Sequence, residues 1–496
     1  MDSLASLGPP AAVAVSLVAA LLIVLSRRSP NIREAWTIVA ALAKFGIVLS
    51  LLPLVLDGQP VGVTLFELSP GISLALRADS LGMLFALSAS FLWILASIYS
   101  IGYMRGLKEH KQTRYYASFA VCMSATIGIA FAANLLTLFV FYEVLTIATY
   151  PLVIHRETPE AMAAGRKYLA YLLTAGVVLL LAIALTLALA GTGDFTPGGF
   201  LRGTADQRML LTLFLLFFLG FGVKGAVMPL HSWLPSAMVA PTPVSALLHA
   251  VAVVKAGVFG VVRVVGFVFG PELTQEIGGA SVAAGLAGAT ILLSSLLALR
   301  QDNLKLRLAY STVGHLSYIM LGTVLLASSA WTGGVFHIVA HGAMKITLFF
   351  VAGAIYVKVH LERISDMDGL GKQMPITMGA FALASLGLAG IPPVVGFLSK
   401  WYLVQGTVEA GRLVFLAILL LSGILNAAYL FPVTVRAFFR SSGRFVRFDE
   451  ASPFMLAPIV MAGALALLLG LAPNAVFHFF TLASRTMVSV LSGGGP

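Results

Sequence analysis

The chain is dominated by long apolar segments separated by short polar stretches. Apolar runs long enough to cross a bilayer as a helix, which takes about 20 residues, recur along the whole sequence. They occupy residues 9–26, 34–56, 80–101, 115–132, 134–153, 162–191, 208–228, 243–268, 278–299, 305–328, 330–357, 375–406, 409–439 and 453–484. We therefore expect an all-α polytopic membrane protein with about 14 transmembrane helices.

Proline interrupts two of these segments. The seventh carries Lys224 and then runs into Pro229 and the stretch LHSWLPSAMVAPTP, and the twelfth contains GIPPVVGFLSK, which ends at Lys400. Proline removes a backbone hydrogen bond and clashes with the preceding turn, so both helices should be broken. Two broken helices five helices apart predict two inverted five-helix repeats, helices 4–8 and 9–13, with a site near the membrane midplane. Two unrelated proline kinks are the alternative.

One polar stretch and the repeats divide the chain further. Residues Asp57–Asp79 alternate between apolar and polar positions and contain Pro and Gly, which predicts a small outer β-hairpin. We expect one integrated membrane domain with four parts. These are 1–112 (three helices and the hairpin), 113–268 (first repeat), 277–440 (second repeat) and 441–496 (last helix and tail).

Charge supports an alternating topology. Of the 31 Lys and Arg residues, 20 lie in alternate connections, at 27–33, 105–114, 156–167, 300–307, 358–372 and 436–447. Five lie in the other connections and the C-terminus, and six lie within the apolar runs. Because cytoplasmic loops carry the excess of Lys and Arg, both termini should be on the outer side of a bacterial-type inner or cell membrane.

Composition excludes several classes of function. The chain is 59% hydrophobic and 10% charged, against about 25% charged residues in soluble domains. The net charge of +11 does not indicate a nucleic-acid partner, because the cations follow the loop pattern. Cys122 is the one cysteine, so neither a disulfide framework nor a cysteine-based metal or iron–sulfur site is expected. No polar region is long enough for a nucleotide or flavin domain, so we expect no cofactor.

Among the charged residues inside apolar segments, five stand out as lying where charge is least tolerated: Glu143, Lys224, Lys255, Lys345 and Lys400. A charge at the centre of a membrane helix costs roughly 2.5–3.5 kcal/mol on insertion scales, so such residues are usually functional. A lysine ammonium can lose its proton when desolvated, whereas arginine practically cannot. The predominance of lysine therefore predicts proton movement.

Glu143 and Lys224 are natural partners under the repeat hypothesis. While the pair is closed, the lysine stays protonated; when the pair separates, the lysine can release its proton. A purely structural buried ion pair is the alternative. Lys400 follows the second break as the expected counterpart of Lys224, with snorkelling to the membrane surface as its alternative.

Histidines add a polar stripe to the eleventh helix. His337, His341 and Lys345 recur at i, i+4 and i+8 in WTGGVFHIVAHGAMKITLFF, which places them along one face. An HxxxH pair can bind zinc, but no cysteine or acid accompanies it, so a proton wire fits better and no metal site is expected. His249 lies six residues before Lys255, about 120° away around the helix. A relay and a hydrogen-bonded structural imidazole are equally compatible with His249.

At these residues the chain resembles a known family. FYEVLTIATYPLV, GVKGAVMPLHSWLPSAMVAPTPVSALLHAVAVVKAGVFG, DNLKLRLAYSTVGHLSYIMLG, FHIVAHGAMKITLFF and GIPPVVGFLSKWYL are similar to stretches of three kinds of antiporter-like proton-pumping subunit. These are the subunits of respiratory complex I, of Mrp-type cation/proton antiporters and of membrane-bound hydrogenases. The shorter subunits, such as the D subunit of Mrp antiporters, are the most similar.

The resemblance implies 14 helices, two inverted repeats and a central polar axis parallel to the membrane. It also implies roles for the following positions: Glu143 as the fifth-helix glutamate, Lys224 as the seventh-helix lysine, Lys255 as the eighth-helix connecting lysine, His341 with Lys345 as the eleventh-helix relay, and Lys400 as the twelfth-helix exit.

The sequence thus predicts a proton-translocating subunit of a multisubunit Na⁺/proton antiporter with no redox site of its own. Its expected partners are other membrane subunits of the same complex, the lipid bilayer, protons and, in the antiporter interpretation, Na⁺. The alternative is a proton-pumping membrane subunit of an NADH:quinone oxidoreductase or hydrogenase. A remote alternative from another class is a membrane scaffold without transport.

Overall fold

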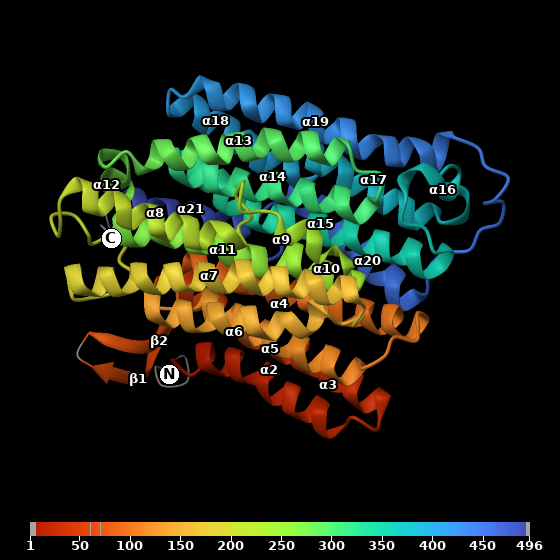
Figure 1. The fold of residues 1–496 in the computed structure, drawn as a ribbon, viewed down its shortest axis with the longest axis horizontal. Helices are drawn as coiled ribbons and strands as arrows, with labels where there is room; N and C mark the ends of the chain where they lie inside the picture. Colours follow the sequence, from red (N-terminus) through yellow and green to blue (C-terminus); the bar gives the residue numbers. More distant parts are fainter. Residues whose placement is uncertain (1–5, 60, 70, 493–496) are drawn as a thin grey trace.

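The structure is a computed structural model that describes residues 6–59, 61–69 and 71–492. Figure 1 shows long helices that run roughly parallel to one another, with a two-stranded hairpin at one end of the bundle. Eleven of the described helices are long and apolar enough to cross a membrane. The all-α class and the small hairpin are confirmed, and the total of fourteen spans and the repeats stay predictions.

The first half of the chain forms the following elements: α2 (Gly8–Leu25), α3 (Pro30–Leu56), β1 (Val61–Ser69), β2 (Ile72–Ala78), α4 (Ser80–Gly106), α5 (Gln112–Ala130), α6 (Leu135–Val153), α7 (Pro159–Ala190), α8 (Gln207–Lys224), α9 (Trp233–Ser236), the 3₁₀ turn η1 (Ala237–Val239), α10 (Thr242–Ala246), the π-helix η2 (Leu247–Val251), α11 (Val253–Arg263) and the π-helix η3 (Val264–Phe269).

The second half continues with α12 (Pro271–Glu276), α13 (Gly279–Leu299), α14 (Leu304–Val324), α15 (Ser328–Val359), the 3₁₀ turn η4 (Ile364–Asp366), α16 (Leu370–Gln373), α17 (Pro375–Ala389), α18 (Val395–Glu409), α19 (Leu413–Phe439), α20 (Pro453–Leu471) and α21 (Phe479–Leu491).

Helix α15 is the central element. Every residue from Ala330 to Ile355 is buried, and the helix packs against α4, α14, α17, α18, α20 and α21. A helix that is buried on all sides can hold polar side chains away from lipid. The polar stripe predicted for this segment therefore lies in the interior of the protein.

Both expected breaks are present. Helix α8 ends at Lys224, five residues before Pro229, and the chain resumes a helix only at Trp233. Between α17 and α18 the helix is interrupted from Gly390 to Val394. A proline cannot donate a hydrogen bond to the carbonyl four residues earlier, and its ring clashes with that carbonyl. For Pro229 this carbonyl belongs to Gly225, which explains why α8 ends at Lys224.

Two of the predicted runs do not form a single regular helix. The run 453–484 is two helices, α20 and α21, because Pro473 follows the end of α20 and the helix restarts only at Phe479. The run 243–268 is not a regular helix, since it contains the π-helical stretches η2 and η3 on either side of α11. A π-helical stretch turns the following residues to a different face, so the angular estimate between His249 and Lys255 does not apply.

The hairpin predicted within 57–79 is confirmed as the antiparallel pair β1–β2. The α5–α6 connection lies alongside the second strand and hydrogen-bonds to it: Ala133 N donates to Ala75 O at 3.0 Å. Arg485 of α21 donates to the carbonyls of Val55 and Leu56 at the end of α3, beside the hairpin. In Figure 1 the hairpin lies at the opposite end of the bundle from the α2–α3, α4–α5 and α19–α20 connections, three of the basic ones.

An ion pair between the buried Arg263 and the partly exposed Asp79 ties this end of the bundle together. Arg263, which is 1% exposed, donates to both carboxylate oxygens of Asp79 at 2.5 and 2.8 Å. Asp79 also caps α4 by accepting from Gly82 N at 2.8 Å. The pair joins the start of α4 to the end of α11, the helix that carries Lys255.

We expect Asp79→Ala to destabilise the protein by about 3–5 kcal/mol, because it leaves the Arg263 guanidinium buried without a counter-charge. The measurement is the thermal unfolding midpoint of the purified full chain in detergent. Asp206→Ala is the control, because Asp206 caps α8 by accepting from Met209 N and forms no ion pair with another described residue. Equal shifts in the two variants would show that only the cap matters.

Candidate functional site

Lys255 and His341 form a direct contact at the centre of the protein. Lys255 Nζ lies 2.9 Å from His341 Nδ1, joining α11 to α15. Lys255 is 1% exposed and His341 is fully buried. A hydrogen bond between an amine and an imidazole is a geometry through which a proton can pass in either direction. The structure thus brings together two residues that the sequence placed on separate helices.

His341 belongs to a cluster of three imidazoles. Its ring centroid lies 5.5 Å from that of His315 and 6.0 Å from that of His337. His315 Nδ1 and His337 Nε2 are 3.0 Å apart. His341 Nε2 has no protein partner, so it is free to exchange a proton with the other two rings. His315 of α14 therefore joins His337 and His341 of α15 in one cluster.

Asn426 and a backbone carbonyl connect this cluster to Lys400. His315 Nε2 lies 3.3 Å from Asn426 Nδ2, which also donates to Leu388 O at 3.1 Å. Lys400 Nζ donates to the same carbonyl at 2.5 Å. A second branch runs from His337 Nδ1 to Ser399 Oγ at 2.8 Å. These contacts form one lysine–histidine row that runs from α11 through α15 to the α17–α18 break. We call it the row; its members are Lys255, His341, His315, His337, Asn426 and Lys400, with Ser399 as a branch.

Lys345 and His249 lie beside this row rather than in it. Lys345 Nζ donates to Leu308 O at 3.1 Å and is fully buried. Neither nitrogen of the buried His249 has a protein hydrogen-bond partner, and its ring packs 4.7 Å from that of Phe349. The structural interpretation of His249, a hydrogen-bonded imidazole, does not match this geometry.

Lys224 and Glu143 are not in contact. Lys224 Nζ donates to Tyr142 O at 2.6 Å and lies over the Tyr142 ring, 3.2 Å from its centroid. The Glu143 carboxylate packs against Gly176 of α7, and its buried Oε1 has no partner. The expected ion pair is thus absent between these two residues here. The reason is local: the backbone and ring of Tyr142 take the ammonium that the carboxylate was expected to hold.

The two break lysines also differ in position. Lys224 is the last residue of the helix before its break, whereas Lys400 lies inside the helix that begins after the second break. Lys400 is only half-buried and lies 5.1 Å from the Tyr318 ring centroid. The two lysines therefore do not occupy equivalent positions relative to their breaks: Lys224 precedes the first break, and Lys400 follows the second.

Several residues of the site were missed by sequence reasoning. Asn426 and Ser399 of the row, and Tyr142 beside Lys224, are uncharged, and an amide or hydroxyl in an apolar helix gives little signal. Tyr429 OH donates to Asn426 Oδ1 at 2.5 Å and is close to Ser311 Oγ at 2.8 Å, which orients the amide. A search for Asn within apolar runs would have found Asn426.

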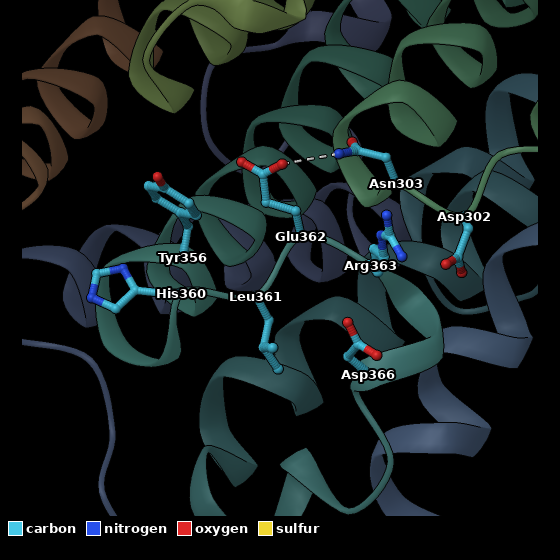
Figure 2. A pocket seen from close by; sticks show the side chains of 8 residues that line it. All are labelled: Asp302, Asn303, Tyr356, His360, Leu361, Glu362, Arg363 and Asp366. Carbon is cyan, nitrogen blue, oxygen red and sulfur yellow. Dashed lines mark hydrogen bonds between the residues drawn. The ribbon is translucent and has the colours of Figure 1, made fainter.

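A polar pocket of about 820 Å³ opens at the end that carries the basic connections. Figure 2 shows its lining residues, with the Glu362 carboxylate turned toward Asn303, whose amide donates to it at 3.2 Å. Its full lining is Asp302, Asn303, Tyr356, His360, Leu361, Glu362, Arg363 and Asp366. Tyr356 and Glu362 also line a small second cavity with Lys305 and the buried Thr242. The acids Glu362 and Asp366 are therefore part of a pocket.

Ion pairs and hydrogen bonds of two acids hold the loops at this end in place. Hydrogen bonds from Lys111 and Arg114 lower the pKa of the Glu157 carboxyl to about 2, so it is ionised at all physiological pH values. Hydrogen bonds from Ser365 lower the pKa of Asp302. These acids hold the α4–α5, α6–α7 and α13–α14 connections to their neighbours.

The fold and the row define a polytopic membrane protein with ionisable side chains aligned through its interior, which is the arrangement expected of an ion-transporting subunit. The sequence matches the family described as NADH:quinone oxidoreductase/Mrp antiporter, transmembrane, over residues 132–426. Residues 68–116 match the N-terminal family of complex I chain 5. The chain belongs to the NADH:quinone oxidoreductase/Mrp antiporter family and is a multi-pass membrane protein.

Relatives come from both branches of the family. The chain is 32% identical over 478 residues to NADH-quinone oxidoreductase subunit N of Desulforudis audaxviator, covering 92% of this chain and 93% of the relative. It is 29% identical over 520 residues to the A subunit of the Na⁺/H⁺ antiporter of Alkalihalophilus pseudofirmus, covering 97% of this chain and 63% of that longer protein. The particular similarity to the D subunit of Mrp antiporters stays a prediction.

Solved structures agree in fold. A chain of the Mrp complex from Dietzia sp. superposes with a TM-score of 0.87 at 21% identity, covering 99% of this chain and 100% of that one. A chain of the membrane-bound sulfane sulfur reductase, an archaeal respiratory membrane complex, also gives 0.87 at 23% identity, with the same coverage. Both likenesses show the fold.

Proposed function

We propose that this chain carries protons along its buried row as a membrane subunit of a multisubunit cation/proton antiporter. The observation that carries the proposal is the contact chain from Lys255 through His341 and the His315–His337 pair to Asn426 and Lys400. Each member can hold or orient a proton, and lipid is excluded from the centre of the row. Membership of the family supports proton translocation as the function.

The first transfer is between Lys255 and His341. A protonated Lys255 donates to His341 Nδ1, and the proton on the opposite nitrogen, Nε2, passes to the neighbouring imidazoles. The ring centroids are 5.5 Å apart, so this second step needs a ring rotation or a bridging water. Protons then leave past Asn426 to Lys400.

Glu143 acts as the electrostatic switch. With Glu143 turned toward Gly176, the contacts of Lys224 within the described residues are the Tyr142 carbonyl and ring, which favour proton release more than a direct ion pair with Glu143 would. When the carboxylate approaches Lys224, the ammonium is favoured instead. Glu143 is half-buried on α6, near the exposed Val144 and Ile147, so a neighbouring subunit on this face can move it.

The pocket of Figure 2 is the proposed entrance from the basic-loop side. Glu362 is shared between the pocket and the second cavity at Lys305, whose Nζ donates to Ala240 O at 2.7 Å. Under the positive-inside rule this side is the cytoplasm, and both termini are then outside. Protons and, in the antiporter, Na⁺ are the proposed transported ions, with other membrane subunits and the bilayer as partners.

We expect Glu143→Gln to reduce proton transport by roughly tenfold, because coupling energies between such sites are typically 1–3 kcal/mol. Proton uptake into vesicles that contain the assembled complex is the readout. Glu272→Gln is the control, because that acid is 82% exposed and its ion pair within the described residues is with Arg202 at 2.7 Å. Unchanged uptake in the Glu143 variant would contradict its role as a switch.

A quinone oxidoreductase or hydrogenase is the second candidate complex, favoured by the subunit N relative that aligns over nearly the full length. Mass spectrometry of subunits that co-purify with the full chain separates the two. Only small hydrophobic partners support the antiporter. Iron–sulfur or nickel subunits would assign the chain to an oxidoreductase.

A further inference from the structure

The α4–α5 connection and the turn after α6 bring two histidines and a carboxylate together. His110 Nδ1 lies 3.8 Å and His155 Nε2 lies 3.7 Å from Glu109 Oε2. The ligating atoms of all three residues lie within 4.8 Å of one another. His155 is 45 positions from His110, so no local pattern groups them. The cluster is at the basic-loop end, remote in the sequence from the lysine–histidine row.

His155 is buried without a hydrogen-bond partner. Its side chain is 0% exposed, and neither ring nitrogen has a hydrogen-bond partner among the residues that the structure describes. Leaving a buried polar group unsatisfied costs about 1–3 kcal/mol, so such a group in a native protein calls for an explanation. The Nε2 atom faces the Glu109 carboxylate at a distance too long for a hydrogen bond. A metal ion between His155 Nε2 and the Glu109 carboxylate would give each of these two groups a partner.

The neighbouring cations do not occupy the Glu109 carboxylate. Lys111 and Arg114 are each held by Glu157 at 2.6 Å. Gln112 donates to the backbone carbonyl of Glu109 and leaves its carboxylate free. Within the described residues, the two imidazoles are the titratable groups in contact with that carboxylate, and Arg156 acts on it electrostatically without an ion-pair contact.

We propose that Glu109, His110 and His155 bind one Zn²⁺ ion. Two imidazoles and one carboxylate are a ligand set typical of zinc, with a fourth position left for water. Bonds of about 2.0–2.1 Å to a tetrahedral ion place ligand atoms about 3.3–3.4 Å apart. The observed 3.7 and 3.8 Å between each imidazole and the carboxylate exceed this by a few tenths of an ångström, and all three ligand atoms lie within 4.8 Å of one another, so side-chain rotations can gather them around one ion. Oxygen-seeking ions such as Mg²⁺ fit two imidazoles poorly.

The ion would join two loops that the polypeptide connects only through the length of α5 and α6. Glu109 and His110 belong to the α4–α5 connection, and His155 lies two residues past the end of α6. The Tyr115 ring packs 5.7 Å from that of His155 and closes one side of the cluster. Zinc would thus fix the cytoplasmic-side end of α6, the helix that carries Glu143. This site is independent of the transport proposal.

Zinc binding by the full chain tests the proposal directly. The protein is purified in detergent without a histidine tag, stripped with EDTA, and titrated with ZnCl₂ by calorimetry. X-ray absorption of the loaded protein reads the ligand types. The variants are His110→Ala, whose side chain is 46% exposed and whose loss should not affect folding, and His155→Ala. His478→Ala, an exposed histidine of the α20–α21 connection, is the control.

We expect one zinc per chain, two imidazole nitrogens in the absorption spectrum, and affinity at least about tenfold weaker in His110→Ala, since even outer-shell changes cost that much. His478→Ala should bind as the wild type does. The proposal is overturned if the wild type binds no zinc, or if His110→Ala binds it as tightly as the wild type. Neither outcome depends on whether the chain transports protons.

Discussion

Lys255→Met is expected to abolish proton transport, with a loss of roughly 100-fold or more, because positioned proton-transfer groups typically contribute 10²–10⁴-fold. The side chain is the hydrogen-bond partner of His341 at 2.9 Å, so its loss removes the link between α11 and the histidine cluster. Methionine fills the same volume without a titratable group. Proton uptake by vesicles that contain the assembled complex is the measurement.

Lys44→Met is a closely matched control. Lys44 is also a fully buried lysine in a long apolar helix, but it donates to Met123 O at 3.1 Å and lies 5.5 Å from the Trp93 ring, outside the row. We expect this variant to assemble and transport normally. Equal loss in both variants would mean that transport needs buried lysines for packing and not for proton transfer.

Lys255→Arg refines the same test. It keeps a positive charge but cannot release a proton, because the guanidinium is not deprotonated in proteins. We expect it to be as inactive as Lys255→Met. Substantial activity in Lys255→Arg would show that a fixed charge suffices at this position.

Gly257→Ala is expected to destabilise the protein by about 3 kcal/mol or more, because overpacking costs about 1–3 kcal/mol even where side chains can yield. A methyl group at Gly257 would clash with Gly225 N and lie 2.8 Å from both the Lys224 carbonyl carbon and Phe221 O. All three are backbone atoms, so relief requires α11 to move away from the end of α8. That movement would separate the helices that carry Lys255 and Lys224.

Gly285→Ala is the matched control for this substitution. Gly285 lies on the exposed face of α13, and a methyl group there meets nothing within 4 Å. Alanine in a helix interior is favoured over glycine by roughly 0.5–1 kcal/mol, so this variant should be as stable as the wild type or slightly more so. The yield of monodisperse protein and the thermal unfolding midpoint compare the two. A Gly257→Ala protein as stable as Gly285→Ala would refute the close backbone contact.

Much of the fold was predictable because the membrane restricts what a chain can do. Apolar runs must be helices, and their ends follow from charge and proline, so the hairpin and both breaks were located correctly. The last run was wrong, since hydropathy does not register a break when the residues around Pro473 are themselves apolar. The π-helical stretches beside Lys255 were also missed, because no local residue preference predicts them.

The site was predictable only in part. Each buried charge could be recognised in the sequence, because an unpaired charge in lipid is expensive and therefore rare. Which side chains contact one another was not predictable. Lys224 contacts Tyr142 rather than Glu143, although Tyr142 and Glu143 are adjacent residues of α6. His315 has the same sequence signature as an ordinary core histidine, yet it joins His337 to Asn426.

The sequence by itself determined the class of protein, the family and the residues with the highest solvation cost, since these depend on composition and order along the chain. Tertiary structure alone decided which of them touch. Contacts such as Lys255 with His341, or His110 beside His155, depend on how helices far apart in sequence pack and on which uncharged groups fill the gaps between them. Those distances set whether a proton or an ion can be shared, and no pattern along one helix contains them.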